Sequence, residues 1–499
     1  MITPIQKKQL EEMGISEEQL NQQIQSFIKG FEFAALVRPA TINDGIIVPS
    51  EKEIEKWTKL YDEYSKTASI LKFVPASGAA SRMFKNLYEF LDNPSANVGG
   101  SIMMRSIDSF AFYQDLSGAL KKLGYDIRTM HNVDDTKIVV ETLLTNKGLN
   151  YGSLPKGLLK FHAYNNETRT ATEEHFVEGL MYAKGANKLQ LHFTISVEHE
   201  QLFIAEFEKL KAKYDKEAEL SISYSFQKKS TDTVAVDVNN VPITDKDGKF
   251  VFRPGGHGAL LENLNDIDAD LIFIKNIDNV VPDHLKHVTV KYKKALAGLL
   301  VFVKTEINEY INYLEANTTI SETLKERIAT FMLKYMGITL PKGMDNSVFA
   351  AYVKSKLDKP IRVCGMVRNV GEPGGGPFWV LNKKGEANLQ IVESSQVDMN
   401  NHQQKVIFDG ATHFNPVDLV CSTKDYSGFK FNLLRFRDNN AGFISEKSVS
   451  GKKVKALELP GLWNGGMAHW ITLMVEVPIL TFNPVKTYAD LLRKEHQPQ

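Results

Sequence analysis

Arg82 and Lys85 close the stretch FVPASGAASRMFK (residues 73–85), in which mainly small residues separate an apolar run from the two cations. Glycine and alanine let the main chain approach an anion closely, and N–H groups at the start of a helix favour negative charge. Arg82 could then bind phosphate oxygens through two parallel hydrogen bonds. The stretch is typical of a phosphate-binding loop, and the alternative is a plain strand-to-helix turn with two solvated cations.

A second constellation lies in residues 252–281. Gly255, Gly256 and Gly258 surround His257, and the apolar run that follows ends at Asp278. A carboxylate at the carboxyl end of a buried strand, near a glycine-rich loop, is well placed to hold Mg²⁺ against a polyphosphate. The alternative is a tight turn and an aspartate that caps the next helix.

Later stretches add further candidates. Gly374-Gly375-Gly376 in VRNVGEPGGGPFWV suits close approach of the backbone to a ligand, and the alternative is a surface loop. Lys486 in FNPVKTYADLL precedes an expected closing helix, and its side chain is either solvated or directed into a ligand crevice. Lys156, which follows Pro155, taken alone indicates only a surface lysine in a loop.

The elements that must position these residues alternate between strand and helix. Short apolar runs such as ILKFVPA (70–76), LQLHFTI (189–195) and DLIFIKNID (270–278) indicate strands, and the segments between them have helical periodicity. Such alternation predicts an α/β fold, a mostly parallel mixed sheet flanked by helices. Ligands of open sheets of this kind bind at the carboxyl ends of the strands, where the candidate loops lie.

The predicted organisation has four parts. Residues 1–70 form a helical extension, in which Ser16 and Gln19 have capping-box spacing. Residues 71–310 form an α/β core with a helical insertion at about 84–150, and residues 311–360 form a second helical insertion. Residues 361–499 complete the sheet and end in a helix, TYADLLRKEH.

The amino-acid composition argues against several functional classes of protein. The 499 residues include 60 basic and 60 acidic side chains, and this balance argues against a general nucleic-acid binder. The 2 cysteines provide neither a disulfide framework nor a metal-binding spacing. No apolar stretch reaches the length of a signal peptide or a membrane span. We therefore expect a cytoplasmic protein without membrane or nucleic-acid partners.

Taken in order, these stretches resemble the sugar-1-phosphate nucleotidylyltransferases, and among them the UDP-sugar pyrophosphorylases. PASGAASRM is similar to the glycine-rich loop of that family, although Ala80-Ser81 stands where the family has Gly-Thr. PGGHG followed by NIDN, and NPVKT followed by DLL, are the more specific matches. The resemblance covers most of residues 71–495 and implies a nucleotide-diphospho-sugar transferase type of fold, which is Rossmann-like.

The resemblance also implies roles for individual residues. The implied catalytic residues are Arg82, Lys156 and Lys486. The implied metal ligand is Asp278, with Asp418 as a second candidate. Nucleotide-binding residues would be Ala76, Ser77, Gly78, Ala79, Ala80, Ser81, Gln227, Gly255, Gly256, His257 and Gly258. Sugar-binding residues would be Asn279, Gly374, Gly375, Glu393 and Asn415.

The resemblance implies a reaction in which a sugar 1-phosphate attacks the α-phosphate of a nucleoside triphosphate and pyrophosphate is released. The implied nucleotide is UTP, and the implied cofactor is Mg²⁺. Two alternatives remain from the sequence. A glycosyltransferase would use a ready-made nucleotide sugar and usually has an Asp-x-Asp metal motif, a spacing found here at residues 268–270. A non-catalytic protein would bind a nucleotide sugar without turnover.

Overall fold

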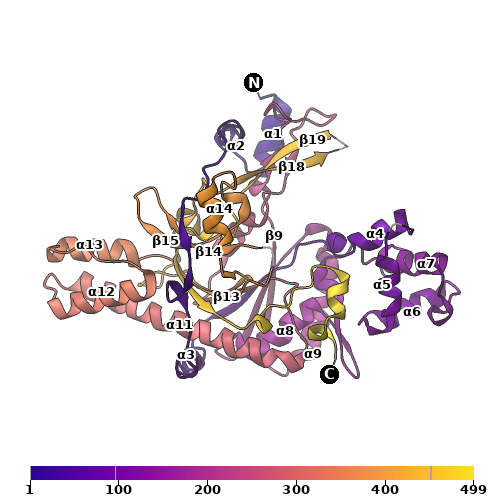
Figure 1. The fold of residues 1–499 in the computed structure, drawn as a ribbon, viewed down its shortest axis with the longest axis horizontal. Coiled ribbons are helices and arrows are strands. Elements are labelled where there is room, and N and C mark those ends of the chain that lie inside the picture. Colours follow the sequence, from indigo (N-terminus) through magenta and orange to yellow (C-terminus); the bar gives the residue numbers. More distant parts are fainter. Residues whose placement is uncertain (1, 96, 372–373, 450–451, 499) are drawn as a thin grey trace. The chain divides into compact units, whose positions relative to one another are not determined.

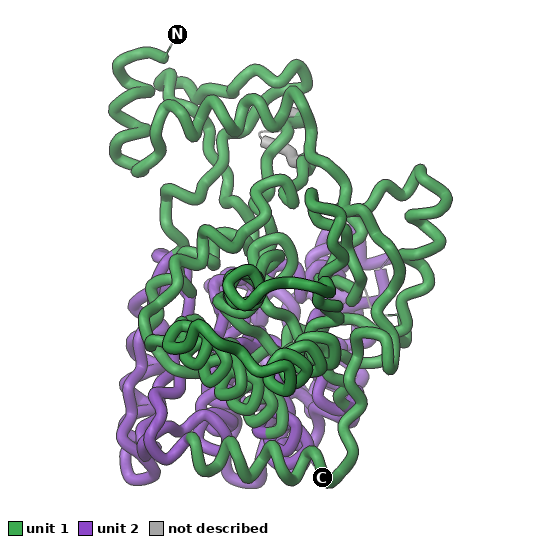
Figure 2. The backbone as a smooth tube through the Cα atoms, turned by 90° about the vertical axis from the view of Figure 1, so that its left-hand side faces the viewer, with its two compact units in different colours: residues 1–64, 227–272, 295–477 green, residues 65–226, 273–294, 478–499 purple. Residues whose placement is uncertain are grey.

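The computed structural model describes residues 2–95, 97–371, 374–449 and 452–498. The chain divides into two compact units, each assembled from several stretches of sequence (Figure 2). Unit 1 comprises residues 1–64, 227–272 and 295–477, and unit 2 comprises residues 65–226, 273–294 and 478–499. The predicted domains were mostly consecutive segments, and their boundaries stay a prediction.

Unit 2 is built on strands whose order in the sheet is β12-β4-β8-β7, with β9 also paired to β8. The pairs β4–β8 and β8–β9 are parallel, and β7–β8 is antiparallel. Strand β4 is buried on both faces, as its largely apolar run predicts. The strands are β4 (Ile70–Pro75), β5 (Lys160–Ala163), β6 (Thr168–Thr170), β7 (Lys184–Gly185), β8 (Lys188–Ile195) and β9 (Glu219–Phe226).

The helices of unit 2 include the predicted insertion at residues 84–150. Its helices form a group of their own, drawn in purple in Figure 1. They are α4 (Lys85–Asp92), α5 (Gly99–Arg105), α6 (Tyr113–Lys122) and α7 (Val133–Leu144). The other helices of this unit are α8 (Ala171–Tyr182) and α9 (Glu200–Tyr214). The division between the units falls within strand β12 (Leu271–Lys275) and helix α11 (Asp283–Ala316).

Helix α8 carries charged side chains into the core of unit 2. Glu178 is fully buried and contacts Lys72 of β4 at 3.2 Å and Lys275 of β12 at 2.9 Å. Glu174, also fully buried, pairs with Lys286 of α11. Buried ions persist only when they are paired and hydrogen-bonded, so these contacts hold α8 against the strands in one register.

A chain of polar contacts links α8 to the carboxyl terminus. His162 lies with Nδ1 2.9 Å from Glu174 Oε1 and with Nε2 2.9 Å from His496 Nδ1. Burial, reinforced by the neighbouring His162, lowers the pKa of His496 to about 3. His496 therefore stays neutral in the folded chain at neutral and mildly acidic pH.

This shift predicts a pH dependence of stability. Below the ordinary pKa of histidine the unfolded chain binds a proton that folded His496 does not, so the free energy of unfolding decreases as the pH falls from about 6.5 toward 3. We expect His496→Gln to make this decrease shallower, and exposed His287→Gln on α11 to leave it unchanged. Urea unfolding between about pH 6.5 and pH 4 measures both slopes, and equal slopes in the two variants would contradict the prediction.

Unit 1 contains a second set of sheet strands in the order β2-β3-β20-β13-β17. The pairs β2–β3, β3–β20 and β13–β20 are parallel, whereas β13–β17 is antiparallel. The strands of this unit are β1 (Leu36–Pro39), β2 (Thr41–Ile42), β3 (Gly45–Ile47), β10 (Thr233–Val234), β11 (Phe252–Arg253), β13 (Ile361–Arg368), β14 (Gly376–Leu381), β15 (Ala387–Val392), β16 (His413–Phe414), β17 (Asp418–Ser422), β18 (Phe443–Val449), β19 (Lys452–Glu458) and β20 (Ile471–Glu476). The predicted mixed α/β fold with a mostly parallel sheet is confirmed, and its Rossmann-like detail stays a prediction.

The helices of unit 1 cover its strands and form a smaller core near the amino terminus. Leu10, Leu20 and Phe27 of the first two helices pack there on Val234 and Leu457. The predicted capping box of Ser16 and Gln19 is present. The helices are α1 (Pro4–Met13), α2 (Glu17–Lys29), α3 (Glu51–Tyr64), α10 (Leu260–Asp266), α12 (Glu322–Met336), α13 (Asn346–Leu357) and α14 (His402–Asp409). No helix within the described ranges is both long and apolar enough to cross a membrane.

Residues 1–70 contain the helices α1, α2 and α3 and also the short strands β1, β2 and β3. Strand β1 pairs with β14, β2 with β3, and β3 with β20. One prediction about local structure is wrong. The expected closing helix is instead two short 3₁₀ turns, Tyr488–Leu492 and Lys494–His496. Asp490 accepts hydrogen bonds from the N–H groups of Lys486 and Thr487, and these contacts shape the start of the first turn.

Candidate functional site

Three of the predicted residues meet within unit 2 around one carboxylate. Asp278 Oδ2 accepts hydrogen bonds from Lys156 Nζ at 2.9 Å and from Lys486 Nζ at 3.0 Å. Asp278 and Lys156 are largely buried, whereas the Lys486 side chain is 58% exposed. Residues far apart in sequence thus place two ammonium groups on one carboxylate oxygen, a group we call the Asp278 cluster.

The loop that follows β4 positions Lys156. Ala79 and Pro155 form an antiparallel bridge, in which Ala80 N–H donates to Leu154 O at 3.0 Å and Lys156 N–H donates to Gly78 O at 3.3 Å. Lys156 therefore contacts both the loop after β4 and the aspartate after β12. The carboxyl ends of these two strands meet at this point, as the sheet rule predicts.

Backbone contacts hold Asp278 against the late segment of the chain. Val485 N–H donates to Asp278 O at 3.0 Å, and Val485 O accepts from Lys156 Nζ at 2.8 Å. Lys486 follows directly, so the position of its side chain is determined by the same contacts. The cluster is consequently one connected structure and not three independent surface groups.

The electrostatics of the cluster favour an ionised Asp278. Burial by itself would raise the pKa of this carboxyl, but the ammonium groups of Lys156 and Lys486 outweigh burial and hold the pKa below its ordinary value. The second oxygen, Oδ1, is buried and has no hydrogen-bond partner among the described residues. An acceptor without a partner in a buried site is costly, and it is available to a ligand.

The small-residue loop, residues 76–82, offers part of the predicted anion cradle. Ala76 N–H donates to Thr194 O, and Ala80 N–H is used in the bridge described above. Within the described part of the chain, the N–H groups of Ser77, Gly78 and Ala79 donate to no backbone carbonyl. Residues 80–82 form a 3₁₀ turn, and the α-helix begins at Lys85.

Arg82 is exposed and is not part of the Asp278 cluster. Among the described residues, its side chain forms no ion pair or hydrogen bond with Lys156, Lys486 or Asp278. Ser81 is exposed beside it. The proposed catalytic role of Arg82 thus stays a prediction.

His175 was not predicted, and it contacts the backbone that leads to Asp278. Its Nε2–H lies 3.1 Å from Asn276 O and 3.2 Å from Ile277 O, the two carbonyls that precede Asp278. Burial, together with nearby Lys72, holds the pKa of His175 well below its ordinary value, so the ring is a neutral donor. The sequence signal was TEEHFVEG (172–179), where charged residues occupy the buried face of a helix.

Unit 1 brings together a second group of predicted residues. The His257 ring stacks on Trp463 with centroids 4.5 Å apart, and Leu462 N–H donates to His257 Nδ1. His257 Nε2 lies 3.6 Å from Glu393 Oε1. Burial lowers the pKa of His257 to about 4, so the ring is neutral near pH 7. We call the group formed by His257, Glu393, Trp463 and their neighbours the His257 cluster.

The glycine loop at 374–376 and Asn415 adjoin this cluster. Asn415 N–H donates to Gly375 O at 2.8 Å, and a Cβ on Gly375 would lie 3.5 Å from Glu393 Cγ. Asn415 Nδ2 is buried and has no partner among the described residues. Residues 372–373 of this loop lie outside the described part of the chain, and Gly374 is exposed.

Two residues of the His257 cluster were missed. Trp463 and Asn464 lie in PGLWNGG (460–466), a glycine-flanked motif that the sequence analysis did not single out. Asn464 Nδ2 donates to Gln396 Oε1 at 2.9 Å, while Asn464 Oδ1 is buried without a partner within the described ranges. A buried donor on Asn415 and a buried acceptor on Asn464 suit a ligand that carries hydroxyl groups.

Glu393 is half-buried, and its surroundings change the pKa of its carboxyl group. Burial and the nearby carboxylate of Glu458 raise its pKa, and a hydrogen bond from Trp463 offsets part of that increase. Gln227 does not contact Glu393 directly. Its Nε2 donates a hydrogen bond to Thr231 Oγ1 at 3.4 Å. Thr231 in turn packs on Gly255, where a Cβ would lie 2.5 Å from Thr231 O.

The PGGHG loop tolerates no side chain at Gly258. A Cβ there would lie 2.2 Å from Pro460 O, and this backbone atom precedes the Trp463 turn. We expect Gly258→Ala to lower the free energy of unfolding by about 1–3 kcal/mol, as overpacking does. Gly118→Ala in α6, where nothing lies within 4 Å, is the control and is expected to be neutral or slightly stabilising. Urea unfolding of both variants tests this, and equal stabilities would contradict it.

Other predicted residues take separate positions. Both side-chain polar atoms of Asn279 contact the 481–483 backbone, with Nδ2 donating to Thr481 O and Oδ1 accepting from Asn483 N–H. Asp418 begins β17 in unit 1 and is buried, whereas Asp278 belongs to unit 2. The sugar-binding role of Asn279 and the metal-binding role of Asp418 stay predictions. No group of three or more His, Cys, Asp or Glu side chains arranged for a metal occurs in the part of the chain that the structure describes.

The Asp-x-Asp spacing at 268–270 does not form a metal site. Lys424 Nζ pairs with Asp268 and with Asp270, each at 2.9 Å. Both aspartates also precede β12 and so lie at the amino end of that strand. The motif that would have favoured a glycosyltransferase is thus a surface ion-pair group.

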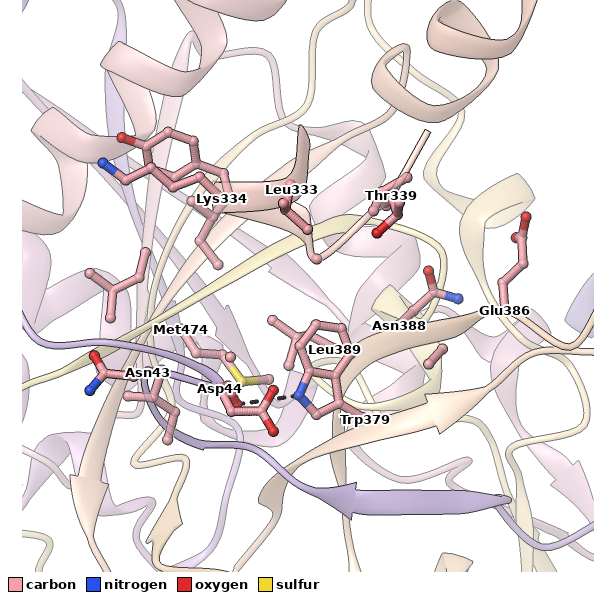
Figure 3. A pocket seen from close by; sticks show the side chains of 18 of the residues that line it. Asn43, Asp44, Leu333, Lys334, Thr339, Trp379, Glu386, Asn388, Leu389 and Met474 are labelled. Carbon is pink, nitrogen blue, oxygen red and sulfur yellow. Dashed lines mark hydrogen bonds between the residues drawn. The ribbon is translucent and has the colours of Figure 1, made fainter. Parts of the chain in front are cut away.

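A cavity of about 750 Å³ in unit 1 is lined by none of the predicted residues among those described. Figure 3 shows Trp379 in this cavity, with Nε1 donating to Asp44 O. Arg38 pairs with Asp44 at 2.6 Å, and Lys356 pairs with Glu386 at 2.6 Å. The charges of these two pairs cancel, and Lys334 adds one further positive charge, so the lining indicates no particular ligand.

Comparison with solved structures finds only distant similarity. A variant of UDP-glucose pyrophosphorylase from Leishmania major, in complex with UDP-glucose, is 13% identical, covers 98% of this chain and 77% of its own, and has a TM-score of 0.44. UDP-glucose phosphorylase from Trypanosoma brucei is 12% identical, with coverages of 98% and 80% and a TM-score of 0.43. The inositol-1-phosphate CTP transferase from T. maritima is 10% identical, with coverages of 86% and 95% and a TM-score of 0.34. At these values no activity or residue role is carried over from them.

Comparison with families is more direct. No curated protein matches the sequence. One family model matches residues 3–497, which is nearly the whole chain. The chain therefore belongs to the family described as "Domain of unknown function (DUF4301)".

Proposed function

We propose that the protein is a Mg²⁺-dependent nucleotidyltransferase that forms a nucleotide sugar and pyrophosphate from a nucleoside triphosphate, UTP in the first instance, and a sugar 1-phosphate. The observation that carries the proposal is the placement of Lys156 and Lys486 on the one carboxylate oxygen of Asp278, at the carboxyl ends of β4 and β12. The cations suit phosphate groups, and the carboxylate suits a metal ion. The sequence resemblance supports the same assignment.

The reaction needs positioning and fixed positive charge more than it needs a nucleophile on the protein. A phosphate dianion is itself the attacking group, so the protein must hold two anions together against their repulsion. Lys156 and Lys486 would donate to phosphate oxygens and exchange their contact with Asp278 for contact with substrate. His257 needs no role as a base, which agrees with its lowered pKa.

The residues present fit a magnesium ion at Asp278. Mg²⁺ is commonly held by one or two carboxylates together with substrate phosphates and waters. Asp278 is ionised, and its Oδ1 is buried without a partner among the described residues, so it provides one such ligand. When bound, the metal would neutralise phosphate charge.

The His257 cluster supports a carbohydrate or nucleoside ligand. Asn415 Nδ2 and Asn464 Oδ1 provide a free donor and a free acceptor within the described residues, and Glu393 provides a carboxylate. These groups match the hydroxyl groups of a sugar or ribose. The stacked pair of His257 and Trp463 adds an aromatic surface of the kind that packs on flat or apolar ligand faces.

The test is a substrate matrix. UTP, CTP, ATP and GTP are each incubated with Mg²⁺ and a panel of sugar 1-phosphates, and pyrophosphate release is followed. We expect turnover with at least one pair, strongest with UTP and abolished by EDTA. Binding of a nucleotide sugar without turnover by any pair would contradict the proposal and support a non-catalytic binding protein.

A further inference from the structure

A larger cavity in unit 1, of about 1160 Å³, is not lined by the residues predicted to act on substrate, although its lining includes Gln396, which accepts a hydrogen bond from Asn464. Three stretches of chain line most of it, residues 30–35, 380–396 and 437–444, together with Lys359 and His469. Glu393, His257 and Trp463 are not among its lining residues. The cavity is somewhat larger than the usual range for small-molecule sites.

The lining of this cavity carries excess positive charge. Its basic residues are Lys356, Lys359, Lys383, Lys384 and Arg437, and its acidic residues are Glu32, Glu386 and Asp438. Lys356 pairs with Glu386, and Lys383 lies 3.6 Å from Glu32. Among the described residues, Lys359, Lys384 and Arg437 form no ion pair.

Lys359 and Arg437 are the informative pair, because both are partly buried and neither forms a direct ion pair among the described residues. The carboxylates of Glu386 and Glu262 attract Lys359 and Arg437, respectively, but lie beyond ion-pair distance. The Arg437 guanidinium makes a neutral contact, Nε to Asn439 Oδ1 at 2.7 Å. Burial lowers the pKa of Lys359, and neighbouring Lys356 lowers it further. Burial also lowers the pKa of Arg437. Holding such cations out of water is unfavourable, and an anion that binds them would recover the cost.

His469 connects these two cations in space. Its N–H donates to Phe436 O, the residue before Arg437, and Lys359 is close enough to lower the pKa of the His469 ring. Burial is the largest cause of that lowered pKa. Lys359, Arg437 and His469 therefore belong to one neighbourhood of the cavity wall.

Many of the remaining lining residues are apolar or carry amide groups, which favours an organic ligand over an inorganic ion. Phe31, Phe33, Val380 and Phe443 provide apolar surface, and the side chains of Gln390 and Asn382 provide amide groups. We propose that this cavity is a separate binding site for a small anionic metabolite, one that carries a phosphate or carboxylate group recognised by Lys359 and Arg437. The site is independent of the chemistry proposed for the Asp278 cluster.

A titration of the full-length chain tests this inference. The background is Lys156→Ala combined with Lys486→Ala, so that anion binding at the Asp278 cluster is removed. Pyrophosphate and glucose 1-phosphate probe the phosphate class, citrate probes the carboxylate class, and glucose is the uncharged control. We expect at least one anionic probe to raise the melting temperature and to give a measurable Kd by calorimetry, with no effect of glucose.

Matched double variants then locate the binding. Lys359→Ala with Arg437→Ala is expected to weaken that Kd at least about tenfold, the loss expected for charge-assisted contacts. Lys342→Ala with Arg435→Ala removes the same charge from exposed positions of unit 1 and is expected to leave Kd unchanged. Should the first double variant fold poorly, amide hydrogen exchange in the background protein must slow at residues 437–444 when the probe is added.

Two outcomes overturn the inference. One is the absence of binding by every anionic probe, and the other is equal weakening in the two double variants or exchange protection only outside the lining. Neither outcome depends on nucleotidyl transfer, because the background lacks the two lysines of the proposed active site. Failure of the substrate matrix would in turn leave this titration unaffected.

Discussion

Replacement of Lys156 by alanine is expected to lower kcat for nucleotidyl transfer by about 10²–10³-fold, the size of effect seen when one preorganised transition-state contact is removed. Lys156 Nζ is almost buried and is held by Asp278 Oδ2 and Val485 O, so it is positioned before substrate arrives. Such a group loses little entropy in the transition state. Lys486 is more exposed, and we expect a smaller loss from its removal.

The measurement is pyrophosphate release under saturating substrate, with the best pair from the substrate matrix. Lys160→Ala is the matched control, because Lys160 lies four residues further along, is partly exposed and pairs with Asp115. The control is expected to keep kcat within about twofold of the wild type, a difference of less than 0.5 kcal/mol in activation free energy. A Lys156→Ala enzyme with wild-type kcat would show that this lysine only supports the fold.

Glu178→Gln is expected to lower the free energy of unfolding by about 3–5 kcal/mol, the usual cost of removing one partner from a buried ion pair. Burial alone would raise the pKa of Glu178, yet Lys275 and Lys72 hold it well below its ordinary value. Burial lowers the pKa of Lys72 to about 7 even with Glu178 beside it. Without the carboxylate, the two fully buried lysines face an amide, and each must either stay charged without a counter-ion or give up its proton, at a cost in free energy.

Urea unfolding near pH 7 measures this loss. Glu208→Gln on the exposed face of α9, where Glu208 contacts Lys211, is the control and is expected to change stability by less than about 0.5 kcal/mol. Replacing Lys72, Glu178 and Lys275 together by Met, Leu and Met is expected to recover much of the loss, because none of these three buried charges then remains. A Glu178→Gln protein as stable as the control variant would mean that water reaches the lysines.

Local sequence patterns predicted most of the elements correctly. The apolar runs of β4, β8 and β12 are visible in sequence because buried strands are rich in apolar residues. The Ser16 cap is visible because its hydrogen bonds involve residues three positions apart. The strands β1 and β3 were missed because their partners, β14 and β20, lie more than 300 residues away in sequence, and the two-residue strand β2 pairs with β3.

The residues of the predicted site also differ in whether their local sequence identifies them. Asp278 was identified from local sequence, since a polar residue after a buried strand lies at the sheet edge where ligands bind. Lys156 could not be recognised from its own neighbourhood, and only the resemblance singled it out. His175 was missed because charged residues next to it on a helix face usually indicate solvent. Trp463 and Asn464 were missed because the glycine-flanked motif PGLWNGG was not singled out.

The sequence by itself determined the type and order of the elements, the small-residue loop after β4 and the carboxylate after β12, because these depend on residues near one another in the chain. Only the tertiary structure decided that Lys156 and Lys486 share Asp278 Oδ2, and that charged α8 lies in a core. Such contacts join residues 122 and 208 positions apart, and the cost of their burial is met only when every partner is in place.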